Sequence, residues 1–225
     1  MAGTAIFDLD LTLTRRGTWS RFVLRLNARR PLFWLQLPVM GVLALAYKLG
    51  IGSRRAVKEY GLSTLKWASR ETLETAAEAF ARDEVPDGLR TQVMQVLEAL
   101  REDGTDLVLA TASAELTAIP IARALGMTRV VATRLEWDAN GHLTGRLLGE
   151  NCYDTEKLKR LEVEDAREPF ARPVSFYSDH VSDLPVMLWA DQAIAVNPLA
   201  PMRRAALEHA ISIVDWDAPP ATMVE

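Results

Sequence analysis

The stretch Ala5-Ile6-Phe7-Asp8-Leu9-Asp10-Leu11-Thr12 places two carboxylates at the end of a short apolar run. That run, Gly3–Asp8, is typical of a strand covered on both faces of a sheet. Side chains alternate along a strand, so Asp8 and Asp10 are expected on one side of it. Ligands of α/β sheets bind at the carboxyl ends of the strands, where such a pair suits a hard cation such as Mg2+. By itself, the pair fits a solvated turn or a helix cap equally well.

The rest of the chain alternates short apolar runs with segments of helical spacing, a pattern that predicts an α/β fold with a Rossmann-like parallel sheet. Further strands are expected at Leu107–Thr111, Arg129–Thr133, Val174–Ser178 and Ala193–Val196, and helices at Leu89–Glu102, Ala114–Leu125, Thr155–Val163 and Leu184–Ala190. Leu135–Asp138 and His142–Leu147 are expected to form a hairpin. Residues 15–85 are predicted to be a helical insert, and residues 1–14 and 86–225 to form the core.

Three more groups of polar residues follow in order, each where a strand should end or a helix begin. Thr111 and Ala112 end the second apolar run, and Lys157 lies in the first turns of a predicted helix. Asp179 and Asp183 follow the run Val174–Ser178. Singly, each could be a helix cap or a solvated side chain. The ordered set of four is much harder to explain by chance, and it indicates a phosphate site with a metal.

With these residues, the chain resembles the haloacid dehalogenase superfamily, in the phosphoserine-phosphatase-like branch (subfamily IB) with a helical cap after the first strand. The resemblance covers nearly the whole chain, from DLDLT at Asp8–Thr12 to SDHVSDLP at Ser178–Pro185. Two positions depart from the branch, because Leu11 stands where Gly or Asn is frequent and Ser178 where Gly is common. Neither departure removes a catalytic group.

The resemblance implies that Asp8 is the nucleophile and carries an aspartyl-phosphate. It implies that Asp10 protonates the leaving alkoxide and then activates water. Mg2+ would be held by Asp8, the backbone carbonyl of Asp10 and Asp179, with Asp183 behind them or bonded through water.

By the same resemblance, Thr111 and the Ala112 N–H would bind the phosphoryl oxygens, and Lys157 would offset their charge. Two other residues invite attention without pointing to chemistry. His180 is expected to be an outward loop residue, because no zinc-type spacing surrounds it. Cys152, the only cysteine, is expected to be a buried small residue.

Charge is unevenly distributed along these 225 residues, of which 49% are hydrophobic and 25% charged. Between Leu11 and Lys58 there are ten Lys and Arg residues and no Asp or Glu, which leaves 16 basic and 30 acidic residues elsewhere. The block contains Pro31–Tyr47, an uncharged stretch about 26 Å long as a helix and expected to be interrupted by Pro38 and Gly41. It could be a buried helical hairpin, but the cations favour an anionic membrane surface bound through residues 15–58.

The reaction is therefore better defined than the substrate. The basic, apolar insert resembles the cap of bacterial phosphatidylglycerophosphatase C proteins, which implies hydrolysis of phosphatidylglycerophosphate at the inner face of the cell membrane, by a cytoplasmic protein. A soluble phosphatase of the phosphoserine type is the alternative, and Glu71, Glu74 or Glu78 would then bind the amino group. A non-catalytic membrane-associated regulator is a third possibility. A nucleic-acid partner is not expected, because the acidic remainder would oppose a polyanion.

Overall fold

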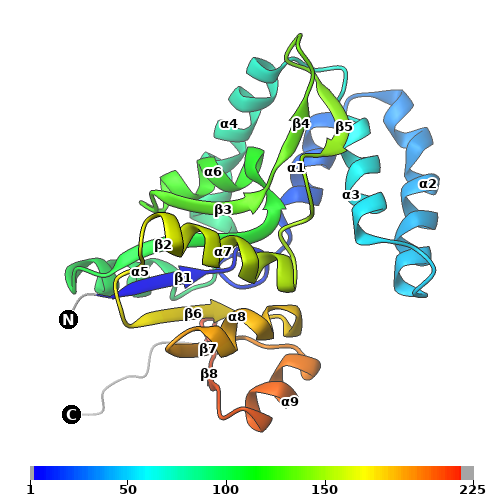
Figure 1. The fold of residues 1–225 in the computed structure, drawn as a ribbon. Coiled ribbons are helices and arrows are strands. Elements are labelled where there is room, and N and C mark those ends of the chain that lie inside the picture. The colour runs from blue at the N-terminus through cyan, green and yellow to red at the C-terminus, as the bar shows by residue number, and fades with distance from the viewer. Residues whose placement is uncertain (1–2, 219–225) are drawn as a thin grey trace.

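A six-stranded parallel sheet forms the centre of the molecule (Figure 1). The computed structural model describes residues 3–218. The strands lie in the order β3-β2-β1-β6-β7-β8, and every neighbouring pair is parallel. Their bounds are Thr4–Phe7 (β1), Asp106–Ala114 (β2), Arg129–Thr133 (β3), Val174–Ser178 (β6), Gln192–Val196 (β7) and Ser212–Val214 (β8). The expected α/β class with a Rossmann-like parallel sheet is confirmed.

Helices cover both faces of the sheet, which explains why its strands are nearly continuous apolar runs. In β1, Ala5 and Phe7 pack on the face that carries α5 and α6, whereas Ile6 packs on the face that carries α7, α8 and α9. These helices span Val93–Glu102 (α5), Glu115–Ala124 (α6), Thr155–Arg167 (α7), Leu184–Trp189 (α8) and Ala200–Glu208 (α9), and a short 3-10 turn, Val181–Asp183 (η1), precedes α8. All four residues of β1 are buried between these two layers, and Asp8 follows directly at the carboxyl end of the strand.

Four helices lie between β1 and α5, on the side of the molecule where the strands end (Figure 1). They are α1 (Thr18–Asn27), α2 (Pro31–Lys48), α3 (Arg54–Ser63) and α4 (Arg70–Gly88). Residues 15–85 thus form helices and contribute no strand, as their spacing indicates. The division into a core and a cap at these bounds stays a prediction, and residues 1–2 and 219–225 of the predicted core lie outside the described residues.

The predicted hairpin forms from β4 (Leu135–Trp137) and β5 (Leu143–Leu147), and it packs against the inserted helices. β5 lies on α3, where a Cβ at Gly145 would stand 3.4 Å from Ser63, and the φ of Gly145 is +87°. The Arg70 N–H at the start of α4 donates to Gly141 O at 2.8 Å. Segments more than fifty residues apart in sequence therefore form one unit over the carboxyl ends of the strands.

Several predicted boundaries are wrong in the structure. The helix predicted from Leu89 begins at Val93, because Leu89 pairs with Thr14 and the Arg90 N–H donates to Leu13 O while the chain returns from α4. The strand predicted to end at Thr111 continues to Ala114, with a register shift after Ala110. The sequence reasoning also missed α9 and the short edge strand β8.

The apolar stretch of the insert forms α2, which is continuous through Pro38 and Gly41 rather than interrupted. Within residues 3–218, α2 is the one helix long and apolar enough to cross a membrane by length and composition. Only Phe33 of α2 is buried. The alternative of a buried hairpin is therefore wrong, because the neighbouring helices cover one face of α2 and leave the other exposed.

Candidate active site

Asp8 stands directly after β1 and is buried against an ammonium group. Lys157 Nζ lies 2.9 Å from Asp8 Oδ1 and 2.7 Å from Asp183 Oδ2. Ser178 Oγ also donates to Asp183 Oδ2, at 2.6 Å. Burial raises the pKa of Asp8 to about 8; the Lys157 charge opposes this rise, and Asp183, Asp179 and Asp10 add to it. Burial acts to lower the pKa of Lys157, but Asp183 and Asp8 outweigh it and hold that pKa above its ordinary value.

Asp10 has different surroundings from Asp8, although both carboxylates line one cavity of about 330 Å³. Its Oδ1 accepts hydrogen bonds from the Thr18 N–H at 2.7 Å and from Thr18 Oγ1 at 2.8 Å. Its Oδ2 accepts from Ser113 Oγ. These donors come from the first turn of α1 and the end of β2, so packing of the insert on the sheet fixes the Asp10 rotamer.

Thr12 connects the Asp8 segment after β1 with the Asp179 segment after β6. Its Oγ1 donates to Asp179 Oδ1 at 3.0 Å, lies 3.5 Å from Asp8 Oδ2 and accepts the Asp179 N–H at 3.0 Å. The carboxylates of Asp8 and Asp179 are thereby held close together. Burial raises the pKa of Asp179, and the Thr12 hydrogen bond opposes that rise.

The residues expected to bind phosphate end β2, in its irregular part. Thr111 is buried, and its Oγ1 accepts the Ser113 N–H at 3.0 Å. Thr111, Ala112 and Lys157 line the same cavity as the carboxylates. The expected hydroxyl and backbone groups therefore lie beside Asp8, but inside the strand end rather than at the first turn of the next helix.

The donors in this cavity suit a hard divalent cation. The described residues hold no group of three carboxylate, imidazole or thiolate side chains placed around one ion. The expected set is different, because it combines the Asp8 and Asp179 carboxylates with the Asp10 backbone carbonyl, and all three are oxygen donors. In addition, Asp183 Oδ1 is buried and has no hydrogen-bond partner. Uncompensated carboxylate charge and an unsatisfied oxygen at one place fit Mg2+.

A second cavity, of about 310 Å³, opens beside Asp10 between α1, α2 and α3. Its wall is mostly apolar and includes Trp19, Val23, Met40, Ala44, Tyr47 and Val57. Among residues 3–218, Asp10 is the one carboxylate in that wall, and it lines both cavities together with Arg54 and Ala112. The two spaces therefore adjoin at Asp10, Arg54 and Ala112.

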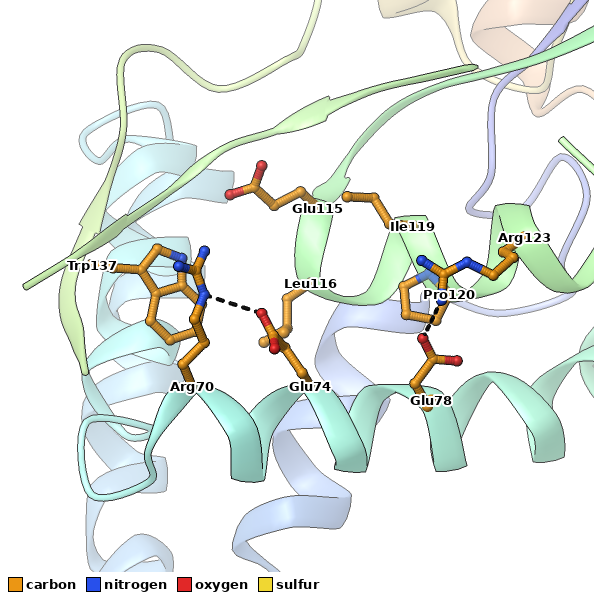
Figure 2. A pocket seen from close by; sticks show the side chains of 9 residues that line it. All are labelled: Arg70, Glu74, Glu78, Glu115, Leu116, Ile119, Pro120, Arg123 and Trp137. Carbon is orange, nitrogen blue, oxygen red and sulfur yellow. Dashed lines mark hydrogen bonds and ion pairs between the residues drawn. The ribbon is translucent and has the colours of Figure 1, made fainter. Parts of the chain in front are cut away.

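Glu74 and Glu78 do not reach this region. They lie on α4 in a separate pocket between α4, α6 and β4, where Glu74 pairs with Arg70 and Glu78 with Arg123 (Figure 2). Glu71 is exposed in the first turn of α4 and lines neither of the two cavities. The fold does not bring these glutamates to Asp8.

Two other expectations have definite outcomes. Cys152 is buried as expected, and burial raises the pKa of its thiol to about 11, so it is not a thiolate nucleophile at neutral pH. His180 is not an outward residue, because it lines the carboxylate cavity and its Nδ1 accepts the Ser182 N–H at 3.1 Å. It caps the turn that carries Asp183.

The sequence reasoning missed several side chains of the site, namely Thr18, Ser113, Arg54, Lys58 and Asn151. Thr18 and Ser113 bond to Asp10, and Lys58 Nζ donates to Ala112 O and to Asn151 Oδ1. Hydroxyl and basic residues are too common for their position in the chain to mark them. Thr18 lies on α1, and Arg54 and Lys58 lie on α3, so only the packing of these helices over the strand ends brings them to Ser113 on β2 and to Asn151.

A family model described as haloacid dehalogenase-like hydrolase matches residues 5–188. Protein CicA of Caulobacter vibrioides is 30% identical over 188 residues, which are 83% of this chain and 82% of that protein. A histidinol-phosphatase of Neisseria meningitidis is 22% identical, over 96% of this chain and all of that protein. A phosphoserine phosphatase of Mycobacterium tuberculosis is 28% identical, over 96% of this chain and 71% of that protein.

Among solved structures, a protein of unknown function from Bordetella pertussis superposes with a TM-score of 0.85. It is 27% identical to this chain, and the match covers 96% of this chain and 99% of the other. The inserted helices and the sheet thus occur together in a second chain of nearly the same extent.

Proposed function

The chain belongs to the haloacid dehalogenase-like hydrolases, and on that premise we propose that it hydrolyses a phosphomonoester through an aspartyl-phosphate on Asp8. Its membership of a hydrolase family, together with relatives named as phosphatases, makes it an enzyme of the phosphatase type. The observation that carries the mechanism is that Asp8, Asp10 and Lys157 line one cavity with Asp179. A fold-preserving regulator without activity is the alternative, and the presence of every expected catalytic side chain opposes it.

In the proposed reaction, an Asp8 oxygen forms a bond to phosphorus while the bond from phosphorus to the alcohol oxygen breaks. Asp10 gives its proton to that oxygen, and the alcohol leaves into the cavity beside it. Asp10 then takes a proton from water, which attacks phosphorus, breaks the bond to Asp8 and releases phosphate. Asp10 suits both steps because three hydrogen-bond donors fix its position without a salt bridge.

The remaining residues would orient the phosphoryl group and balance its charge. Mg2+ bound by Asp8, the Asp10 carbonyl and Asp179 would reduce the repulsion between carboxylate and phosphate. Thr111 and the Ala112 N–H would donate to the phosphoryl oxygens, and Lys157 would face the charge that they develop. Asp183 holds Lys157 in place through the contact at 2.7 Å.

For the substrate, the favoured candidate is a lipid phosphate, with phosphatidylglycerophosphate converted to phosphatidylglycerol. The cavity beside Asp10 supports this choice, because its wall is mostly apolar with basic residues, and Asp10 is its one carboxylate among the described residues. An amino-acid or amino-alcohol phosphate needs a counter-charge for its ammonium group, and Glu74 and Glu78 are paired elsewhere. A soluble substrate of the phosphoserine type stays the second candidate, since relatives are named for phosphoserine and histidinol phosphate.

We further propose that residues 15–58 bind an anionic membrane at the inner face of the cell membrane. On α2, Leu32, Leu35, Val39, Val42 and Leu45 follow one another at helical spacing and are exposed. Arg29 and Arg30 flank one end of this stripe, and Lys48 flanks the other. Four of the ten cations in the basic block pair with carboxylates, namely Arg15, Arg21, Arg25 and Arg55. The other six have no such partner among the described residues. Arg54 and Lys58 line the cavity beside Asp10, and the remaining four complement anionic lipid.

The test of function is Mg2+-dependent phosphate release from phosphatidylglycerophosphate in mixed micelles, and from free phosphoserine and histidinol phosphate. Wild type is compared with Asp8→Asn and with Asp106→Asn, an exposed aspartate at the amino end of β2. Release from the lipid that Asp8→Asn abolishes and Asp106→Asn preserves would support the proposal. Faster release from phosphoserine than from the lipid would favour the second candidate. Phosphate release by Asp8→Asn at the wild-type rate would refute the mechanism.

Membrane binding is tested by flotation with anionic vesicles at low salt. Leu35 on α2 and Leu207 on α9 are 74% and 75% exposed, which makes them a matched pair. Leu35→Asp is expected to abolish flotation and Leu207→Asp to leave it intact. Equal flotation of both variants with wild type would contradict a role for α2.

A further inference from the structure

Two cations on α3 line the same cavity as Asp10, and neither forms an ion pair with a carboxylate among the described residues. Arg54 and Lys58 lie one helical turn apart, and both line the apolar cavity beside Asp10. Among residues 3–218, no carboxylate lies within 4.0 Å of either cation. Arg55, which lies between them in sequence, behaves differently, because it pairs with Glu59 at 3.0 Å and with Glu150 at 3.2 Å.

The partners of these two cations are all neutral. The Arg54 Nε and Nη2 atoms donate to the Tyr47 hydroxyl at 3.1 Å and 2.9 Å, and the guanidinium carbon lies 3.9 Å from the Tyr153 ring centre. Lys58 Nζ donates to Ala112 O and to Asn151 Oδ1. A guanidinium has five donor hydrogens and an ammonium has three, so both groups keep donors for a further acceptor.

Holding two like charges together in a partly buried place is unfavourable. Burial lowers the pKa of Lys58 to about 8; the nearby Asp10 opposes this fall, and Arg54 adds to it. A structural role alone would be served by an uncharged side chain at lower desolvation cost. The arrangement is suited to a ligand that brings negative charge to the leaving-group side of Asp10.

We propose that Arg54 and Lys58 bind a second anionic group of the substrate, carried by the alcohol that leaves. The inference rests on the proposed function and narrows its substrate class to phosphomonoesters in which an apolar chain and a second anion, such as a phosphodiester, share the leaving group. Met40, Ala44 and Val57 face the apolar part, and the two cations face the anion. Phosphoserine has a carboxylate for these cations, but the one carboxylate that the described residues offer its ammonium group in this cavity is Asp10, which the proposed reaction uses for proton transfer.

The experiment compares kcat/KM for phosphatidylglycerophosphate and for its analogue in which the internal phosphodiester is methylated to a neutral triester. Lys58→Met is expected to lower kcat/KM about 10- to 100-fold for the anionic substrate, as for the loss of a charged hydrogen bond. For the triester, the same variant is expected to stay within about twofold of wild type. Arg54→Met is also expected to lower kcat/KM more for the anionic substrate than for the triester. Lys58→Arg is expected to retain most of the wild-type preference for the anionic substrate.

Arg55→Met is the matched control, since it removes a neighbouring cation that is already paired, and it is expected to leave the ratio of the two kcat/KM values unchanged. An equal loss for both substrates in Lys58→Met, with an unchanged melting temperature, would overturn the inference and assign Lys58 to holding Asn151. If wild type hydrolyses the triester and Asp8→Asn does not, the proposed function stands even when the inference about Lys58 fails. Failure of wild type to hydrolyse either substrate would instead refute the lipid substrate of the proposed function, and with it this inference.

Discussion

Thr12 and Asp179 bond to each other twice, although 167 positions separate them in the chain. Thr12 Oγ1 donates to Asp179 Oδ1 at 3.0 Å, and the Asp179 N–H donates to Thr12 Oγ1 at 3.0 Å. The pair connects the loop after β1 with the loop after β6, and these strands are neighbours in the sheet. Thr12 is thus a positioning residue for a carboxylate of the expected metal site.

Thr12→Val is expected to raise the Mg2+ concentration needed for half-maximal phosphate release about 10-fold or more, because a carboxylate ligand loses its orienting partner. A Mg2+ titration of phosphate release measures this change. The control is Thr14→Val, which alters a buried hydroxyl that bonds only to the backbone carbonyls of Leu9 and Arg16. An unchanged Mg2+ dependence in Thr12→Val would contradict the positioning role.

Lys157→Met is expected to lower the free energy of unfolding by about 3–5 kcal/mol at pH 8, because Asp8 and Asp183 would remain buried without their counter-charge. The loss should shrink as the pH falls toward 5, since burial raises the pKa of Asp8 to about 8 and Asp8 then takes up a proton in the folded state. Urea unfolding at the two pH values measures this, and Lys159→Met on the exposed face of α7 is the control. A loss that does not vary with pH would argue against charge as its cause.

Mg2+ is expected to raise the melting temperature more at pH 8 than at pH 5. The pKa of Asp8 is about 8 in the folded, metal-free protein, against 3.8 for an ordinary aspartate. The folded state therefore binds more protons than the unfolded state between these values, and metal-free stability falls as the pH rises through that window. Mg2+ needs the ionised carboxylate and reverses the fall. Differential scanning fluorimetry of wild type and Asp8→Asn tests this, and an equal Mg2+ effect in the two proteins would contradict it.

Leu11→Asn is expected to stabilise the fold by about 0.5–1 kcal/mol. The φ of Leu11 is +67°, a left-handed conformation that Asn adopts more readily than Leu does. Thermal unfolding of Leu11→Asn measures the gain. Leu148 is also exposed and is not among the described residues with positive φ, so Leu148→Asn should show no such gain.

Thr4→Val is expected to stabilise the protein by about 1 kcal/mol, which corresponds to a rise of about 2–4 °C in melting temperature. Thr4 Oγ1 is buried and has no hydrogen-bond partner, so an isosteric methyl group removes an unsatisfied polar atom. Thr117→Val is the matched comparison, because that buried hydroxyl donates to Ala114 O at 3.1 Å and its loss should destabilise. A destabilised Thr4→Val would show that water reaches this hydroxyl.

The apolar stripe of α2 shows which features of the fold could be predicted from the sequence and which could not. The letters Pro31–Tyr47 indicated an apolar segment with cationic ends, but not whether a neighbouring helix covers it. A buried hairpin and an exposed surface share this pattern, and only the packing of α2 against α3, which leaves most of α2 exposed, decides between them. Ion pairs could not be predicted from the sequence for the same reason. Arg21 pairs with Glu84 and Arg25 with Asp83, and both carboxylates lie on α4.

The sequence by itself indicated most of the alternation of strands and helices, and it placed Asp8 and Asp179 directly after strands and Lys157 in the first turn of a helix. These features are readable because the spacing of apolar residues reflects local secondary structure. In addition, parallel strands bring their carboxyl ends to one edge of the sheet. Only the tertiary structure decided that Thr12 orients Asp179 and that Arg54 and Lys58 stay unpaired beside Asp10. Hydrogen bonding, burial and charge pairing join segments that are far apart in the chain, so no local pattern contains them.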